Sequence, residues 1–220
     1  MNFAEKKLLI FDLDGTIADT LYSIMEAVNM CMEHYGFPLK TYDEVRAAVG
    51  NGAKNLIMRT MPEAEAQNVE RAEEIYRHFQ TCYDATHDHI DGCYEGMREA
   101  MLSLRGRGYV LAVLSNKPNA YVLNIIDRLF EKGDISIAMG ETALPRKPDP
   151  TAPLYIASEL GFAPSECAFI GDSEVDILTA QNSGFASVAV SWGFRSRSDL
   201  EASRPDIIID HPSQLLEIFE

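Results

Sequence analysis

Two aspartates stand two positions apart directly after an apolar segment near the N-terminus. The run Leu8–Phe11 is followed by Asp12 and Asp14, and then by Gly15 and Thr16. If the chain stays extended, side chains two positions apart point to the same side, so both carboxylates face one site. Two acids at a strand end are unfavourable unless a cation or a proton compensates their charge. The alternative is a simple Asp-Gly turn after a strand.

Three further segments have polar residues where an apolar run ends. Ser115 and Asn116 precede a predicted helix, whose free N–H groups could bind an oxyanion. Lys147 precedes a proline, which keeps it in an extended loop as a positioned point charge. Asp172 and Asp176 are four positions apart and share a face of the first turn of a predicted helix. Taken singly, each segment has an ordinary alternative. Ser115 or Asn116 could cap a helix, Lys147 could lie in a solvated linker, and the two acids could simply stand at a helix start.

The combination of the four segments is more specific than any one of them. A parallel sheet collects the ends of its strands along one edge, where four aspartates and one lysine would give a net formal charge of −3. Acids crowded in this way repel one another and any phosphate. One Mg²⁺ would bring the charge to −1 and could bridge a carboxylate and a phosphoryl oxygen. The sequence therefore predicts a magnesium site for a phosphorylated substrate.

Strands and helices alternate along most of the chain. Helical stripes, such as the one through Val122, Ile126 and Leu129, lie between short apolar runs rich in β-branched residues. This alternation predicts an α/β fold, with a parallel, Rossmann-like sheet and helices on both faces. The expected strands are residues 8–11, 110–114, 135–139, 168–170, 188–190 and 207–209.

Residues 19–90 have helical stripes and no convincing strand. We therefore predict a helical domain inserted after the first strand, and an α/β domain made of residues 1–18 and 91–220. The segment His87-Asp88-His89 falls near the return to the α/β domain. Its histidines are not a helical turn apart, so a solvated segment is expected there rather than a metal site.

The composition is that of a globular protein with an excess of acid. Of 220 residues, 46% are hydrophobic, and 34 acidic against 19 basic side chains give a formal charge of −15. This balance argues against a nucleic-acid partner or an anionic membrane surface, which both need clustered Lys and Arg. The polar N-terminal residues lead us to expect no secretory signal, and the sequence has no apolar run of membrane length and no CxxC pair, so a cytoplasmic location is expected. The sequence does not indicate an oligomeric state.

Together the four motifs resemble those of the haloacid dehalogenase superfamily of phosphotransferases, and the match covers essentially the whole chain. The resemblance implies that Asp12 is the nucleophile and forms an aspartyl-phosphate. It implies that Asp14 protonates the leaving group and then activates the hydrolytic water. The motifs are Asp12-Leu13-Asp14-Gly15-Thr16, Ser115, Lys147 and Gly171-Asp172-Ser173-Glu174-Val175-Asp176, in the order of the superfamily.

The resemblance also implies how the cofactor would be held. Asp12, Asp172 and the main-chain carbonyl of Asp14 would ligate Mg²⁺, and Asp176 would orient the surrounding shell.

The transferred phosphoryl group would be bound by three residues outside the aspartate motifs. The resemblance assigns this role to Ser115, Asn116 and Lys147, and it has Lys147 also hold the nucleophile in position.

The helical insert resembles the cap of one subgroup of this superfamily, which would close over the active site. Its Gly50-Asn51-Gly52 loop is the expected substrate contact. Lys54 and Arg59 are candidate anchors for a substrate carboxylate, with exposed surface charge as the alternative. Where relatives often have Tyr-Pro-Gly at the return to the sheet domain, this chain has Tyr94-Glu95-Gly96.

Several stretches, among them Ser191-Trp192-Gly193-Phe194-Arg195, are similar to those of phosphoglycolate phosphatases. We therefore expect an enzyme, a Mg²⁺-dependent phosphoric monoester hydrolase acting on a small phosphorylated metabolite such as phosphoglycolate. The alternatives are a phosphomutase acting on a hexose phosphate, similar to β-phosphoglucomutase, and an inorganic pyrophosphatase. A phospho-receiver signalling domain also uses acids, Mg²⁺ and a lysine, but it is about half this length and has no place for the insert.

Overall fold

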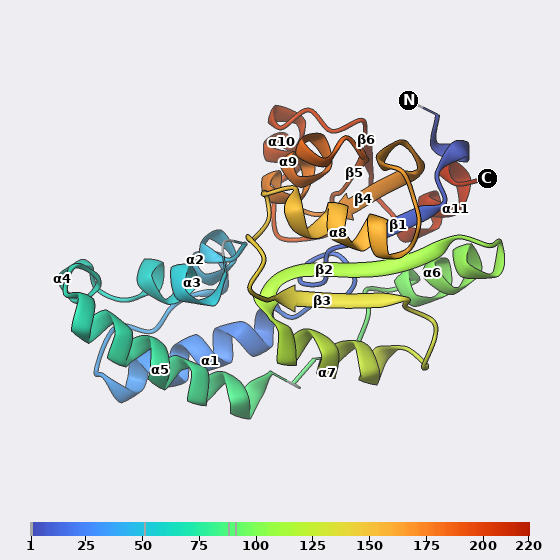
Figure 1. Cartoon of the computed structure of the whole chain (residues 1–220). Coiled ribbons are helices and arrows are strands. Elements are labelled where there is room, and N and C mark those ends of the chain that lie inside the picture. Colours follow the sequence, from blue (N-terminus) through green and yellow to red (C-terminus); the bar gives the residue numbers. More distant parts are fainter. Residues whose placement is uncertain (1, 51, 88, 91) are drawn as a thin grey trace. The chain divides into compact units, whose positions relative to one another are not determined.

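The structure is a computed structural model that describes residues 2–50, 52–87, 89–90 and 92–220. The chain divides into two compact units, one comprising Met1–Asp19 with Gly92–Glu220 and the other comprising Thr20–Asp91. The first unit is built on a sheet and the second on helices (Figure 1).

The sheet of the first unit has six strands within the described ranges, and every pair of neighbours is parallel. The predicted α/β fold with a parallel sheet is therefore confirmed. The strand order is β3-β2-β1-β4-β5-β6, which places the first strand of the chain in the middle of the sheet. The strands are β1 (Leu8–Phe11), β2 (Val110–Pro118), β3 (Ile137–Glu141), β4 (Cys167–Gly171), β5 (Ala186–Val190) and β6 (Ile207–Ile209).

The central strand β1 sets the level at which the sheet ends. Its last residue, Phe11, lies beside Val113 of β2 and Ile170 of β4. The ladder continues one step further, because the N–H of Asp12 donates to the carbonyl of Ile170 at 2.9 Å. Residues that follow these strands therefore emerge at one edge of the sheet, where ligands bind in open α/β folds.

Strand β2 is longer than the sequence predicts. The prediction ended at residue 114 because the following residues are polar, but the strand runs on to Pro118. Its register with β3 shifts between Leu114 and Pro118, which then lies beside Glu141. The polar residues Ser115, Asn116 and Lys117 are buried in this extension. They therefore belong to the edge of the sheet and not to a surface loop.

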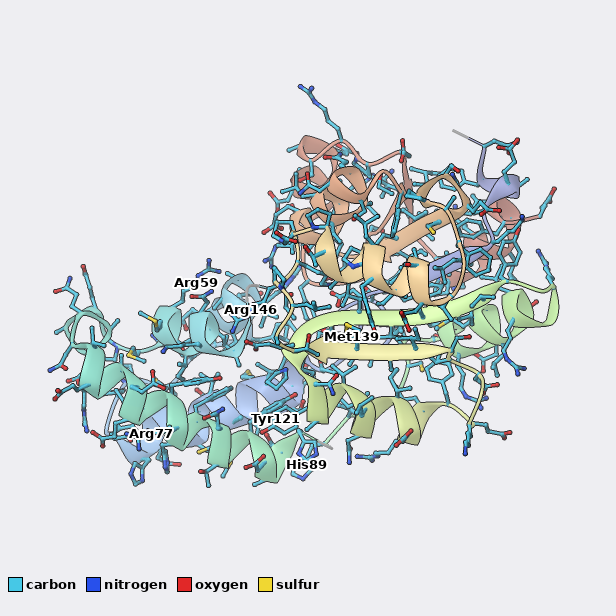
Figure 2. The ribbon with its side chains drawn as sticks, viewed as in Figure 1. Arg59, Arg77, His89, Tyr121, Met139 and Arg146 are labelled. Atoms are coloured by element: carbon cyan, nitrogen blue, oxygen red, sulfur yellow. The ribbon has the colours of Figure 1, made fainter. Side chains whose placement is uncertain are left out.

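Helices pack on the sheet because its strands are apolar on both faces. Helices α6 (Met97–Gly106) and α7 (Asn119–Leu129) contact β2, and α7 also packs on β3. Figure 2 shows Tyr121 on α7 and Met139 on β3. The unit is completed by α10 (Arg197–Ala202), α11 (Leu215–Ile218) and the 3₁₀ turns η1 (Phe3–Glu5), η2 (Pro164–Glu166) and η3 (Pro212–Gln214).

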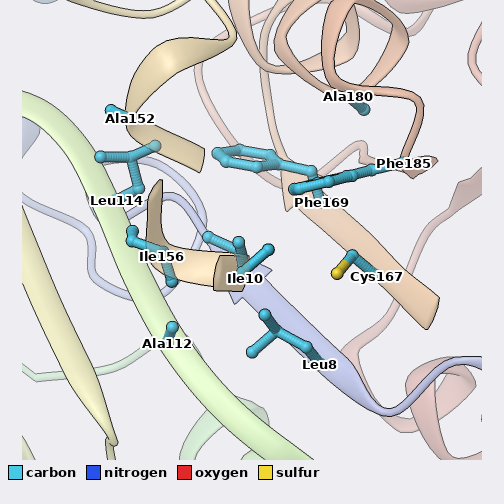
Figure 3. Close-up of a cluster of buried hydrophobic side chains, with 11 residues drawn as sticks. Leu8, Ile10, Ala112, Leu114, Ala152, Ile156, Cys167, Phe169, Ala180 and Phe185 are labelled. Carbon is cyan, nitrogen blue, oxygen red and sulfur yellow. The ribbon is translucent and has the colours of Figure 1, made fainter. Parts of the chain in front are cut away.

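One face of the sheet is covered by α8 (Thr151–Glu159) and α9 (Glu174–Ser183). Leu8 and Ile10 of β1 pack there against Ile156 of α8 (Figure 3). Leu9 and Phe11 alternate with them and are also fully buried, so the opposite face is covered as well. With both faces covered, the apolar strands hold the carboxyl-end edge rigidly in place.

The second unit contains five helices within the described residues: α1 (Leu21–His34), α2 (Tyr42–Ala48), α3 (Ala53–Thr60), α4 (Glu63–Gln67) and α5 (Val69–Thr86). Its main packing contact joins α1 and α5. A capping box of Thr41 and Glu44 begins α2, and the side chain of Asn68 caps α5. No helix among the described residues of either unit is long and apolar enough to cross a membrane.

Candidate active site

Three aspartates from two strand ends and one helix meet at the edge of the sheet. Asp12 follows β1, Asp172 follows β4, and Asp176 lies in the first turn of α9. One carboxylate oxygen of each lies within 4.8 Å of the others, and all three side chains are buried. The structure thus brings together three of the four aspartates that the sequence singles out, in an arrangement that could hold a metal ion.

Glycines make this crowding possible. A Cβ at Gly15 or at Gly193 would collide with the carboxyl group of Asp172, and a Cβ at Gly171 would collide with Asp176. Gly15 also has a φ of +84°, which L side chains rarely adopt. The carboxylates can therefore lie against main chain from three separate segments only because those positions lack a side chain.

Asp176 is held by the start of its own helix. Ser173 is the N-cap of α9 and forms a capping box with Asp176. The hydroxyl and the N–H of Ser173 both donate to Oδ2 of Asp176, at 2.6 and 3.1 Å. The other oxygen, Oδ1, accepts a hydrogen bond from Nζ of Lys147 at 2.7 Å. The carboxylate of Asp176 is therefore fixed on both sides, which suits a positioning role next to a metal.

Lys147 places its ammonium group between two of the acids. Its Nζ lies 2.8 Å from Oδ1 of Asp12 and 2.7 Å from Oδ1 of Asp176, and the side chain is only 3% exposed. Burial alone would lower the pKa of Lys147, but the charges of Asp12 and Asp176 outweigh burial and raise it. Lys147 therefore stays charged and compensates part of the acid cluster.

Asn116 fixes the main chain of Lys147. Its Oδ1 accepts from the N–H of Lys147, and its Nδ2 donates to the carbonyl of Lys147, both at 3.0 Å. The side chain of Asn116 thus clamps the lysine loop to β2, and its predicted contact with phosphate stays a prediction. Ser115 accepts a hydrogen bond from the N–H of Lys117 at 3.3 Å, and a hydroxyl that accepts in this way can still donate to an oxyanion.

Asp14 has a partner that the sequence reasoning missed. Nζ of Lys117 lies 2.7 Å from Oδ1 of Asp14, and the two side chains are 4% and 14% exposed. A signal was available, because Lys117 stands two positions after Ser115 and would share its side of an extended strand. It was missed because the strand was expected to end at residue 114.

The charge of the site without a cation is unbalanced. Counting Lys117, four aspartates and two lysines give a formal charge of −2 instead of the −3 expected from the sequence. Burial, then repulsion from Asp176, raises the pKa of Asp12 to about 7, although Lys147 opposes the rise. Burial and the charges of Asp176 and Asp12 also raise the pKa of Asp172 well above its ordinary value. Buried carboxylate oxygens with two negative charges in excess fit a hard divalent cation such as Mg²⁺.

We expect the protein kept free of divalent cations to lose stability as pH rises. Asp12 has a pKa of 3.8 in an ordinary setting and about 7 in the folded chain, so over this window the folded chain holds a proton that the unfolded chain has lost. The free energy of unfolding should then fall by up to about 1.4 kcal/mol per pH unit for this proton.

Urea unfolding in a chelator at several pH values between about 4 and about 8 measures the effect. Saturating Mg²⁺ should flatten the decline, because it compensates the same carboxylates. Asp12→Asn should make the decline shallower without Mg²⁺, and the raised pKa of Asp172 accounts for the decline that remains. Chelated wild-type protein whose stability rises steadily through this window would contradict the prediction.

The segment after β5 is a second feature that the sequence reasoning did not assign to the site. The N–H of Phe194 donates to Oδ2 of Asp172 at 2.6 Å, and the indole N–H of Trp192 donates to the carbonyl of Thr16 at 3.1 Å. These bonds connect residues far apart in the sequence. Residue types do not reveal which main-chain N–H groups donate hydrogen bonds. Only Gly193, between Trp192 and Phe194, could have indicated that this segment lies close to another.

The residues predicted to contact substrate from the helical unit remain untested by the structure. Gly50 and Gly52 lie before α3 in that unit, and Asn51 lies outside the described residues. Lys54 forms an ion pair with Glu73, and Nη1 of Arg59 on α3 donates to a carbonyl of the same unit (Figure 2). These contacts agree with the alternative reading of the two cations as surface charge.

The segment predicted to be solvated follows α5. His89 is exposed and His87 is half-buried, and Nδ1 of His89 lies 2.9 Å from Glu26, while Asp88 lies outside the described residues (Figure 2).

Comparisons with known proteins agree over nearly the whole chain. Residues 9–190 match the family model of haloacid dehalogenase-like hydrolases. The chain is 31% identical to a phosphoglycolate phosphatase of Vibrio vulnificus strain YJ016, over 99% of this chain and 98% of that protein. It is 32% identical to a phosphoglycolate phosphatase of Pasteurella multocida strain Pm70, over 97% and 98%. A crystal structure of a predicted phosphoglycolate phosphatase from Haemophilus somnus 129PT superposes with a TM-score of 0.90 at 30% identity, covering 97% of this chain and 98% of that one.

Proposed function

The chain belongs to the haloacid dehalogenase-like hydrolases, and we propose that it is a Mg²⁺-dependent phosphatase that forms an aspartyl-phosphate on Asp12. The proposed substrate is a small phosphate monoester of the phosphoglycolate type. The observation that carries the proposal is the buried cluster of Asp12, Asp172 and Asp176 with Lys147 between two of its members. The names of the relatives at 31–32% identity support the substrate class.

The cation would be held by carboxylates that the fold already places together. Asp12 and Asp172 would be ligands, with the main-chain carbonyl of Asp14 as a third. Asp176, fixed by Ser173 and Lys147, would orient the ligands from outside. When bound, Mg²⁺ supplies positive charge that offsets the charge of the phosphoryl oxygens.

In the first step, a carboxylate oxygen of Asp12 attacks phosphorus in line with the ester oxygen. The new O–P bond forms as the bond from phosphorus to the leaving oxygen breaks, and Asp14 delivers a proton to that oxygen. Lys147 holds the nucleophile through its ion pair and faces the charge of the transferred group. The hydroxyl of Ser115, buried at the end of β2, is proposed to donate to a phosphoryl oxygen.

In the second step, Asp14 is a carboxylate and removes a proton from water as the water attacks phosphorus. The O–P bond to Asp12 breaks, inorganic phosphate leaves, and Asp14 is protonated again for the next cycle. The same carboxyl group thus serves in both steps, which requires that it stay in one place while substrate, intermediate and product exchange.

Lys117 is proposed to keep Asp14 in that place through its 2.7 Å ion pair. We expect Lys117→Met to lower kcat for an alkyl phosphate by about 10- to 100-fold, because a misplaced acid protonates the leaving oxygen poorly. The loss should be much smaller for 4-nitrophenyl phosphate, whose leaving group departs without a proton. Steady-state kinetics with both substrates measure the difference.

Lys132→Met is the matched control, because Lys132 is exposed on the surface. It should leave both activities unchanged. Equal losses for the two substrates in Lys117→Met would mean that Lys117 supports the site in general and does not position the acid.

The function itself is tested by phosphate release from a panel of esters, with Mg²⁺ and with a chelator. The panel should contain phosphoglycolate, hexose phosphates, nucleotides and pyrophosphate. We expect release to need Mg²⁺ and to be fastest with phosphoglycolate. Equal turnover of every ester would contradict the substrate assignment, and conversion of a hexose phosphate without phosphate release would contradict the phosphatase.

A further inference from the structure

The loop that follows β5 approaches the acid cluster from a direction that the four motifs do not account for. The N–H of Phe194 donates to Oδ2 of Asp172 at 2.6 Å, and this bond is buried. Asp172 is 2% exposed and lies beside Asp12 and Asp176, whose charges repel it. Nearby like charges disfavour the charged form of a carboxyl group, whereas a hydrogen bond donated to the carboxylate favours it. The amide of Phe194 fixes one of its two oxygens.

The same loop also holds the turn that carries the first two aspartates. The indole N–H of Trp192 donates to the carbonyl of Thr16 at 3.1 Å. Thr16 is fully buried at the end of the turn that begins with Asp12. Trp192 and Phe194 thus bind two different ligand-carrying segments, one after β1 and one after β4.

Gly193, between these two residues, shows how closely the segments are pressed together. A Cβ on Gly193 would collide with Asp172 and with the main-chain carbonyl of Gly15. Gly193 is not among the glycines with a positive φ, so a left-handed backbone is not what requires glycine here. The requirement for glycine here is one of space alone. The ring of Phe194 completes the contact, because it lies 3.1 Å from where a Cβ of Gly15 would be.

We propose that Trp192, Gly193 and Phe194 are positioning residues that set the distance between Asp12 and Asp172 and thereby the affinity for the divalent cation. The inference rests on the proposed function, because it assumes that the cluster binds Mg²⁺. Groups that orient metal ligands typically change metal affinity by about 10- to 100-fold when removed. A loop that served packing alone would instead affect stability and leave affinity unchanged.

Two variants of the full chain test the inference by different physical changes. Gly193→Ala adds one methyl group that must push Asp172 away from the main chain of Gly15. Trp192→Phe removes the indole N–H and keeps an apolar ring, so it serves if the first variant fails to fold. The Mg²⁺ dissociation constant is measured by titration calorimetry without substrate, and circular dichroism establishes that each variant is folded.

The matched controls change the same kinds of group away from the acids. Ser191→Ala removes a hydroxyl of the same loop that donates to Asp210, and Gly106→Ala adds a methyl group where nothing lies within 4 Å. Both controls should bind Mg²⁺ as the wild type does.

We expect Gly193→Ala to weaken Mg²⁺ binding by about 10- to 100-fold and Trp192→Phe by several-fold. Folded variants that bind Mg²⁺ with wild-type affinity would overturn the inference and leave the proposed phosphatase intact. A wild-type protein that binds no Mg²⁺ would overturn the proposed function together with the inference. The two failures are therefore distinguishable in one set of titrations.

Discussion

Asp12→Asn should remove the phosphatase activity while leaving the fold intact or more stable. An amide cannot attack phosphorus, so kcat should fall on the order of 10⁴-fold or more, as expected when a nucleophile is lost. The free energy of unfolding should rise, although kcat falls. Burial and Asp176 raise the pKa of Asp12 to about 7, which means that the ionised carboxylate is disfavoured in the folded chain. In chelated protein at about pH 8, a neutral amide should therefore raise the free energy of unfolding.

Phosphate release and urea unfolding of the same preparation measure the two effects. Asp127→Asn is the control, because it removes a carboxylate from the exposed surface of α7. It should change neither quantity appreciably. Full activity in Asp12→Asn would exclude the covalent mechanism, and a variant that is inactive because it is unfolded would contradict the expected gain in stability.

Lys147→Met should damage both activity and stability. The ammonium group of Lys147 lies within 2.8 Å of Asp12 and of Asp176, and methionine keeps most of its volume without its charge. Removing one partner of a buried ion pair typically costs about 3–5 kcal/mol, because the carboxylates are left uncompensated. The loss of one group that stabilises developing charge typically lowers kcat by about 10²- to 10³-fold. Lys147→Met should thus lower the free energy of unfolding, whereas Asp12→Asn should raise it.

Mg²⁺ gives this prediction its sharpest test. Added Mg²⁺ should restore much of the stability of Lys147→Met, because the cation supplies the positive charge that the variant lacks, whereas kcat should stay low. Denaturant unfolding with and without Mg²⁺ measures the recovery, and Lys132→Met again serves as the control. Equal stability of Lys147→Met and the wild type in a chelator would contradict the assigned role of the lysine in the acid cluster.

The fold was predictable because its signals are local. The apolar run Leu8–Phe11 is buried on both faces of the sheet, and runs of this kind alternate with helical stripes along the first unit. The meeting of Asp12 with Asp172 followed from the same pattern, since parallel strands end at one edge. The extension of β2 was not predictable, because the sequence turns polar after Leu114 while the strand continues to Pro118.

The missed parts of the site depend on contacts between distant segments. Lys117 pairs with Asp14 across 103 positions of the sequence, and this pair changes the charge of the site from −3 to −2. The donors at Trp192 and Phe194 reach Thr16 and Asp172 through geometry that residue types do not encode. Taken alone, the formal charge of −15 would disfavour a phosphate substrate, but the charge is not spread evenly over the molecule. At the site, two buried lysines and one bound divalent cation would together offset the charge of the four aspartates completely.

The stereochemical course at phosphorus tests the central claim, an aspartyl-phosphate formed and then hydrolysed, most directly. A phosphorothioate monoester that carries two different oxygen isotopes at phosphorus is hydrolysed by the wild-type enzyme with Mg²⁺ in water of the third isotope, and the configuration of the released thiophosphate is then determined. Two in-line displacements, first by Asp12 and then by water, invert phosphorus twice, so we predict net retention. Net inversion would mean that water attacks the substrate in a single step and would contradict a covalent intermediate on Asp12.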